Sequence, residues 1–493
     1  MIYLKISKFF KELSINKFIS IIILFQILLH IPYMNLPPMG QHTWRQVMGL
    51  STAKNYYTEK NSFLYPSQDV RVNLQDKGII YFEFPLIYWI IGKSYHLNGF
   101  NHLNGRIMML IMGILFLYGC IQLGKSLNLS EKRIKWFIFF TSCSPFFFYY
   151  SISVSPNLPA LTWFIWGIAL LIKYIDKPLW DFKYLLPITL ITIGTLSKAT
   201  YLFFGLIIAY IFIRKYNIFL DIKIFIKILI TACLILVPNL LFFNHANNIY
   251  IEAPFERQSY AVLKGSFFPN NLEDFLNTLG PAISTWFLEM FVNTAAIPIF
   301  IYSIFHVIKH KNFKNDTAYF LMFWLLSFFI FSLFFFTQFR EHAYYLTPLI
   351  IFSSLMNAYG IEKILAIDRV KYLSYFLIIL VPIVMIGRVH HRWVKTKQVP
   401  NELLYHAEQI NSYIPKKEMV LVYGDKSPVI YLYYLNRKGV VINKLNQKSI
   451  NKYKKSEFNY IVGQFNEQEV ELMEDLDIKL IKIIGSFSIY SRI

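Results

Sequence analysis

The sequence predicts a polytopic α-helical membrane protein with a small α/β domain at its C-terminal end. Three observations support this prediction. Of the 493 residues, 55% are hydrophobic and 18% are aromatic, far above the share in soluble domains. The apolar residues fall into about eleven runs, most of them suited to crossing about 30 Å of hydrocarbon. After residue 387 this pattern gives way to short apolar segments separated by turn residues.

The apolar runs that we interpret as membrane spans are separated by polar loops. Lysines precede the first run, but no small-residue cleavage site follows it, so we interpret this run as a retained helix and not as a cleavable signal. The runs lie at residues 17–32, 106–124, 136–150, 158–174, 184–196, 201–213, 224–243, 283–304, 319–336, 345–357 and 372–386.

The formal net charge of +20 is explained by membrane topology, because the basic residues are concentrated in particular loops. In a soluble protein such a charge would suggest a nucleic-acid partner, but here Lys and Arg fall largely in alternate loops, as the positive-inside rule predicts. The basic loops place the N-terminus in the cytoplasm. With eleven spans, the tail from about residue 388 is then outside. We therefore expect no nucleic-acid partner.

This topology divides the chain into a transmembrane domain, residues 1–387, and an extracytoplasmic α/β domain, residues 388–493. In the tail, residues 402–413 have a helical pattern. Four short apolar segments are strand candidates because turn residues separate them. These segments are residues 419–423, 429–435, 440–442 and 460–462.

The long first outside loop, residues 33–105, contains the most informative motif, Gln41-His42-Thr43-Trp44-Arg45-Gln46. Loops of this length are usually functional or disordered, and the many aromatic residues argue for order. Trp44 and Arg45 could alternatively be an interfacial pair. Glu83 lies among aromatic residues, where a carboxylate is costly unless a cation, a metal or a substrate group partners it. Asp69, Arg71, Asp76 and Lys77, by contrast, are expected on a solvated face, with contact to substrate as the alternative.

Other outside loops add groups suited to binding phosphate. Lys198 joins two apolar runs on the side that is otherwise poor in positive charge, either to bind phosphate or to extend toward the interface. Arg340, His342 and Tyr345 supply hydrogen-bond donors in one short loop. The alternative for that loop is an interfacial belt in which Arg340 pairs with the neighbouring Glu341.

The sequence contains no Gly-rich phosphate loop and no zinc-ligand spacing, so the chemistry must come from dispersed loop residues. The order of these motifs resembles that of the bacterial GT-C glycosyltransferases related to protein O-mannosyltransferases and to the lipid A aminoarabinose transferase. The resemblance covers most of the chain. It rests on residues 42–46, 81–85, 106, 155–159, 197–198, 342–348, 422–425 and 433–439.

The resemblance implies a GT-C-like fold in the bacterial cytoplasmic membrane and transfer at its outer face. The expected donor is a sugar linked to polyprenyl phosphate, and the expected acceptor is a lipid, a glycan or a protein. Fixed cations and hydrogen-bond donors would stabilise the leaving phosphate. The candidates for this role are Arg45, Lys198, Arg340, His342 and Tyr345, and further site candidates are Trp44, Gln46, Arg106 and Asn157.

The chain departs from this group at the catalytic base. Members commonly carry an acidic residue near the start of the first loop and often another near the second-loop proline, where this chain has His42 or Thr43 and Asn157. His42 is one candidate base, because histidine ordinarily titrates near pH 6.5. Glu83 is the other candidate, either as a base or as part of a divalent cation site. No cofactor is certain from the sequence.

Two other classes compete with this hypothesis. A transporter or flippase for lipid-linked envelope glycans would also be polytopic and basic inside, but transporters usually place ionisable residues or broken helices at mid-membrane and often show paired halves. A non-catalytic envelope assembly protein would have no use for His42 or Glu83. The clustering of ionisable residues in outside loops favours the glycosyltransferase.

The charge distribution predicts the topology directly. Reporter fusions at Lys311 and Lys371 are expected to report the cytoplasm, and fusions after Val394 the outside, because the basic loops stay inside. A cytoplasmic location of the fusions after Val394 would contradict the predicted topology.

Overall fold

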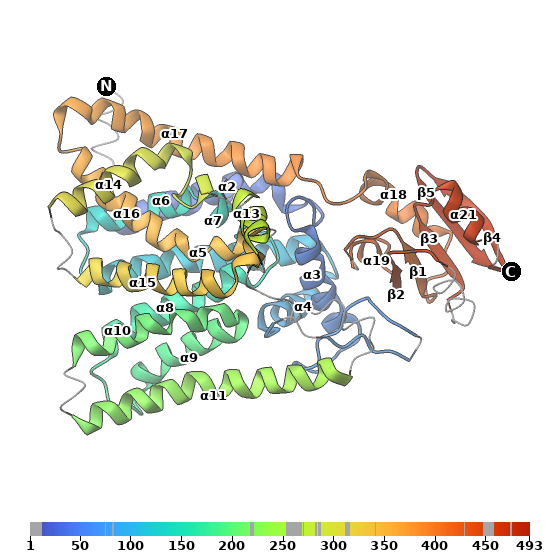
Figure 1. The fold of residues 1–493 in the computed structure, drawn as a ribbon, viewed down its shortest axis with the longest axis horizontal. Coiled ribbons are helices and arrows are strands. Elements are labelled where there is room, and N and C mark those ends of the chain that lie inside the picture. The colour runs from blue at the N-terminus through green and yellow to red at the C-terminus, as the bar shows by residue number, and fades with distance from the viewer. Residues whose placement is uncertain are drawn as a thin grey trace. The chain divides into compact units, whose positions relative to one another are not determined.

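The computed structural model describes residues 12–73, 75–80, 83–216, 221–252, 269, 271–281, 283, 287–310, 316–340, 342–427, 429–446, 458–473 and 476–493. These residues are mostly helical and include a five-stranded sheet (Figure 1). They belong to two compact units. Unit 1 comprises Met1–Asn35, Arg106–Phe243 and Gly265–His391, and unit 2 comprises Leu36–Gly105, Asn244–Lys264 and Arg392–Ile493.

Unit 1 contains long apolar helices. Six helical segments of the described residues are long and apolar enough to cross a membrane. They are α2 (Ile15–Met34), α5 (His102–Ser126), α8 (Asn157–Tyr174), residues 222–251 of α11 (Ile222–Glu252), α15 (Asp316–Phe334) and residues 368–395 around α17 (Lys371–His390). Each coincides with a predicted run. The chain is therefore a multi-pass membrane protein, and eleven spans stay a prediction.

The predicted run at residues 136–150 is divided into two helices, α6 (Glu131–Ser142) and α7 (Pro145–Tyr150). Pro145 has no N–H to donate, and Ser144 caps the helix that starts there. The carbonyls released at the break are hydrogen-bonded. Gln26 Nε2 donates to Ser142 O at 3.0 Å, and Asn293 Nδ2 donates to Cys143 O at 3.1 Å. Irregular backbone inside a membrane protein requires such partners.

Two other predicted runs begin with a 3-10 turn. Residues 201–213 correspond to η1 (Ala199–Phe204) followed by α10 (Gly205–Lys215), and residues 345–357 to η6 (Ala343–Leu346) followed by α16 (Leu349–Ile364). The run predicted at 283–304 contains the start of the regular helix α14 (Ile297–Lys309), which begins near the end of that run. Apolar composition alone does not distinguish these turns from regular helix.

Helices α8 and α9 (Phe182–Ser197) pack side by side, as Figure 1 shows. Two glycines permit the close approach. A Cβ atom on Gly194 would lie 2.9 Å from Ala160 O, and one on Gly167 would lie 2.9 Å from Pro187 O. Small residues at a helix crossing are the usual way for membrane helices to gain packing contacts. This crossing positions the end of α9, where Lys198 follows.

Unit 2 contains a mixed sheet in the order β2-β1-β3-β5-β4. β1 (Val420–Tyr423) runs parallel to β2 (Gly439–Ile442) and β3 (Tyr460–Gly463), while β5 (Phe487–Arg492) is antiparallel to β3 and β4 (Ile478–Ile484). Helices α18 (Asn401–Ser412), α19 (Ile430–Tyr434) and α21 (Glu467–Met473) complete this part. The predicted helix at 402–413 and the strands at 419–423, 440–442 and 460–462 are confirmed.

The predicted strand at residues 429–435 is wrong, because this segment forms α19. Asp425 explains the difference. Its carboxylate accepts hydrogen bonds from Ser427 N at 2.9 Å and from Tyr431 N at 2.8 Å, which turns the chain into a helix directly after β1. Burial raises the pKa of Asp425 to about 6.

The first loop and the C-terminal sheet belong to the same unit because their backbones pair. Val70 forms a parallel bridge with Gly439 at the start of β2, where Gly439 N donates to Asp69 O at 3.0 Å and Arg71 N donates to Gly439 O at 2.6 Å. The expected division at residue 387 instead placed the loop, residues 33–105, with the membrane spans.

Ion pairs reinforce this junction. Lys54 of α3 (Thr43–Thr58) donates to Asp69 at 2.7 Å and to Asn436 Oδ1 at 3.3 Å. Arg71 pairs with Glu59 at 2.8 Å, and Lys438 contacts the same carboxylate. The expectation that Asp69 and Arg71 lie on a solvated face is wrong, since both are buried.

Candidate active site

The Gln41–Gln46 motif forms a tight turn at the start of α3. Gly40 has φ +93° and His42 has φ +56°, both in the left-handed region. Such a conformation is uncommon for residues other than glycine and persists only where the surroundings enforce it. Thr43 Oγ1 donates to Gly40 O at 2.7 Å, and His42 O accepts from Arg45 N at 3.0 Å. The His42 side chain is buried.

Residues of the C-terminal segment hold this turn in place. Gln41 N donates to Arg392 O at 3.0 Å, and the Arg392 guanidinium donates to Gln41 Oε1. Gln398 Oε1 accepts from Thr43 N at 3.0 Å, which satisfies one of the N–H groups exposed at the start of α3. The sequence carries no signal for these partners, because they lie far away in the chain.

Glu83 contacts two protein donors. Its carboxylate forms an ion pair with Arg45, and Tyr88 of α4 (Leu86–Asn98) donates its hydroxyl to the other oxygen. The side chains of Arg45 and Glu83 are 7% and 6% exposed. The sequence predicted a cation, a metal or a substrate group as the partner of this carboxylate, and in the structure the partner is the cation Arg45. Tyr88 was not predicted, since nothing distinguishes it from other aromatic residues of the loop.

A second group of candidates lies in unit 1. Lys198 follows α9 and is half-buried, with its Nζ 4.8 Å from the ring centroid of Tyr344 and 4.7 Å from that of Tyr345. Aromatic faces attract a cation electrostatically. Tyr345 itself packs among Phe331, Phe335 and Phe339. The structure thus brings together two predicted residues, Lys198 and Tyr345, and adds Tyr344.

Arg340 and His342 line a polar cavity of about 240 Å³. The remaining lining residues are Asp274, Thr278, Thr337 and Gln338. Helix α13 (Leu272–Pro281) packs on η5 (Phe336–Arg340) through Phe275 and Phe336, whose rings stack at 4.9 Å. Glu341, the alternative partner of Arg340, lies outside the described residues.

The remaining candidates make local contacts. Arg45 lies over the Trp44 ring at 5.9 Å, and Gln46 Nε2 donates to Met39 O at 3.5 Å. Arg106 Nη1 donates to Ile152 O at 3.1 Å, which supports the turn between α7 and α8. Asn157 is buried at the start of α8, and its backbone oxygen accepts from Tyr201 Oη at 3.4 Å. These contacts give Arg106 and Asn157 a supporting role in unit 1.

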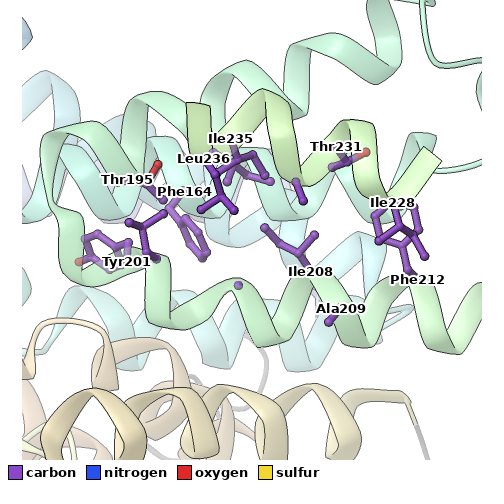
Figure 2. A pocket seen from close by; sticks show the side chains of 14 residues that line it. Phe164, Thr195, Tyr201, Ile208, Ala209, Phe212, Ile228, Thr231, Ile235 and Leu236 are labelled. Carbon is purple, nitrogen blue, oxygen red and sulfur yellow. The ribbon is translucent and has the colours of Figure 1, made fainter. Parts of the chain in front are cut away.

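An apolar groove of about 300 Å³ lies between helices α9, α10 and α11 of unit 1. Figure 2 shows that it extends from Thr195 and Tyr201 at one end to Phe212 and Ile228 at the other. Lys198 lies between Thr195 and Tyr201 in the chain, and Tyr201 N donates to Lys198 O at 2.9 Å. The groove therefore ends beside the backbone of the half-buried cation.

The divalent cation considered from the sequence stays a prediction. No group of three or more His, Cys, Asp or Glu side chains among the described residues could hold a metal ion. Glu83, the carboxylate considered for such a site, already accepts from Arg45 and Tyr88.

Comparison with known proteins relates the chain to membrane glycosyltransferases. The family model described as dolichyl-phosphate-mannose-protein mannosyltransferase matches residues 83–242. The structure of ArnT from Cupriavidus metallidurans in the apo state matches with a TM-score of 0.65 at 8% sequence identity, over 97% of this chain and 98% of ArnT. The chain has the fold of the GT-C glycosyltransferases. No curated protein sequence gives a significant match.

Two ligand-bound structures share this GT-C fold. ArnT from Cupriavidus metallidurans bound to undecaprenyl phosphate matches with a TM-score of 0.65 at 9% identity, over 97% of this chain and 99% of ArnT. The archaeal oligosaccharyltransferase AglB from Archaeoglobus fulgidus, in complex with an inhibitory peptide and a dolichol-phosphate, matches with a TM-score of 0.59 at 11% identity, over 92% of this chain and 70% of AglB. The resemblance inferred from the motifs is confirmed.

The buried pair of Arg45 and Glu83 predicts a large loss of stability on truncation. Glu83→Ala is expected to destabilise the protein by about 3 to 5 kcal/mol, because Arg45 is left buried without its counter-charge. Asp316→Ala is the matched control, since it breaks a pair with Arg214 whose side chains are 50% and 57% exposed, and it should cost about 1 kcal/mol or less. Thermal unfolding in detergent measures both, and equal losses would contradict the assignment.

Proposed function

We propose that the chain transfers a sugar from a polyprenyl-phosphate donor to an acceptor hydroxyl on a lipid, glycan or protein at the outer face of the bacterial cytoplasmic membrane. The observation that supports this most is the apolar groove that ends beside Lys198. A polyprenyl phosphate has the same two parts, a long apolar chain and an anionic head. ArnT, which has the same fold, binds undecaprenyl phosphate.

In this proposal the prenyl chain lies in the groove of Figure 2 and the phosphate lies at Lys198. The groove side chains come from membrane-embedded helices and are almost all apolar, so they suit a chain that enters from the lipid phase. Tyr344 and Tyr345 hold the ammonium group in place and can donate their hydroxyls to phosphate oxygens. Fixed donors of this kind stabilise the charge that develops on a leaving phosphate.

The reaction is a single displacement. The acceptor oxygen forms a bond to the anomeric carbon while the bond from that carbon to the phosphate oxygen breaks, so the polyprenyl phosphate leaves with the electron pair. The hydroxyl proton passes to a base. Attack from the face opposite to the leaving group inverts the anomeric configuration.

His42 is the base in this proposal. It lies in a strained turn held by Arg392 and Gln398, and such turns often mark functional positions. Glu83 is less suited, because protonation would weaken its ion pair with Arg45 and its hydrogen bond from Tyr88. We assign Glu83 a positioning role, in which it fixes Arg45 on α3 close to the turn.

Removal of Lys198 tests the donor site. Lys198→Ala is expected to weaken binding of undecaprenyl phosphate by about tenfold or more, because a charge-assisted contact contributes about 1.5 to 3 kcal/mol. Lys227→Ala is a matched control, since Lys227 also lies over a tyrosine ring, 4.3 Å from the centroid of Tyr184, but beside the far end of the groove. Equal affinity of wild type and Lys198→Ala, or a larger effect at Lys227, would contradict the proposal.

The base is tested by the rate of sugar transfer. His42→Ala is expected to lower turnover by about 100-fold or more while donor affinity stays near that of wild type. In the wild type the rate should fall at acid pH as the imidazole takes up a proton, and this fall should be absent from the residual activity of His42→Ala. A wild-type rate in His42→Ala would exclude His42 as the base.

A further inference from the structure

We propose that the cavity formed by α13 and η5 is the sugar subsite of the donor, and that it takes an uncharged, polyhydroxylated ring. This inference rests on the proposed function and refines it. Arg340 and His342, expected from the sequence to bind phosphate, are reassigned to the sugar. Lys198 and its two tyrosines remain the phosphate site.

The lining of the cavity offers the hydrogen-bonding groups that a sugar needs. Asp274 supplies acceptors, Arg340 supplies donors, and Gln338 supplies both. The hydroxyls of Thr278 and Thr337 and the imidazole of His342 donate or accept according to their partner. Sugar hydroxyls also donate and accept, so a mixed set suits them. A cavity of about 240 Å³ lies just below the range of about 300 to 1,000 Å³ typical of drug-sized ligands, as expected for a single ring.

The charges of the lining argue against phosphate in this cavity. Asp274 contributes one negative charge and Arg340 one positive charge to the lining of the same cavity. A carboxylate facing a phosphate repels it, since like charges at short range are destabilising. A neutral hydroxylated ring incurs no such repulsion and can accept from the guanidinium while donating to the carboxylate.

The cavity wall is built by local structure. Asn271 Oδ1 accepts from Asp274 N at 2.8 Å, which caps the first turn of α13. Thr278 Oγ1 donates to Asp274 O at 2.9 Å, and the spacing of four residues places both side chains on one face of the helix. On the opposite wall, His342 N donates to Gln338 O at 3.0 Å. The backbone segments that carry the lining residues of the cavity are therefore fixed by local hydrogen bonds.

The cavity is linked to the phosphate site by one aromatic residue. The His342 ring stacks on Tyr344 with centroids 5.1 Å apart, and the same Tyr344 ring holds Lys198 at 4.8 Å. A donor whose phosphate lies at Lys198 thus has a polar cavity next to it for the group attached to that phosphate. Unit 1 therefore has one set of donors for the phosphate, at Lys198, and a second set for the sugar, in the cavity lined by Arg340 and His342.

The test compares bare and sugar-bearing lipids. Affinities of the full-length protein in detergent are measured for undecaprenyl phosphate and for undecaprenyl-phosphate esters of a hexose, a pentose and an aminopentose. Wild type is expected to bind the hexose or the pentose ester more tightly than the bare lipid and more tightly than the charged aminopentose ester. Asp274→Asn and Thr278→Val should each reduce that preference, Asp274→Asn by about tenfold, and leave affinity for the bare lipid unchanged or higher. Lys198→Ala should weaken both lipids alike.

The neighbouring carboxylate is the matched control. Glu273→Gln alters the same first turn of α13, but Glu273 is exposed and does not line the cavity, so the preference should stay at the wild-type value. The sugar subsite is overturned if no ester binds better than the bare lipid, or if Asp274→Asn and Thr278→Val leave the preference unchanged. Failure of wild type to bind any of these lipids would instead overturn the proposed function itself.

Discussion

Buried charge on helix α3 is the constraint on which unit 2 depends. Arg45 is neutralised by Glu83, Lys54 by Asp69, and Glu59, just after the helix, by Arg71 and Lys438. An uncompensated charge in such surroundings costs several kcal/mol, so α3 is stable inside the unit only when the loop that follows it is in place, and Lys438 adds one contact from the C-terminal segment. The turn at His42 is held separately, by the contacts of Arg392 and Gln398 with Gln41 and Thr43. The geometry of a candidate catalytic residue therefore depends on hydrogen bonds from segments distant in sequence.

Unit 1 places its polar groups where regular helices end. Lys198 lies between α9 and η1, and Tyr344, Tyr345 and His342 lie in or beside η6. In a membrane protein, backbone that leaves the helical pattern is tolerated only against other protein or a polar cavity. The breaks therefore coincide with the cavity beside Arg340 and with the end of the apolar groove. One structural requirement of the bilayer accounts for both the irregular turns and the location of the candidate ligand sites.

Hydrophobicity and turn chemistry predicted a good part of this fold. Six long apolar runs became long helices because length and composition suffice for a span, and β1, β2, β3 and α18 followed their local patterns. Residues 429–435 were assigned wrongly because Asp425, outside the segment, decides its conformation. The loop positions of Lys198, Arg340 and His342 were apparent from the sequence, whereas the contacts of Tyr88 and Arg392 were not. Their roles arise from tertiary contacts, which single-sequence patterns do not encode.

The backbone bridge between Val70 and Gly439 has a consequence for synthesis. The loop that carries α3 is made early, yet its partners in β2 and at Arg392 leave the ribosome much later, since Gln41 and Arg392 are 351 residues apart. Chains are generally folded from the N-terminus as they emerge, and distant contacts form slowly. The contacts of this loop with Arg392 and with β2 can therefore form only after the last part of the chain has been translated and delivered to the same compartment. A chain truncated before Arg392 would carry the membrane helices but would lack the hydrogen bonds from Arg392 and Gln398 that hold the turn at His42.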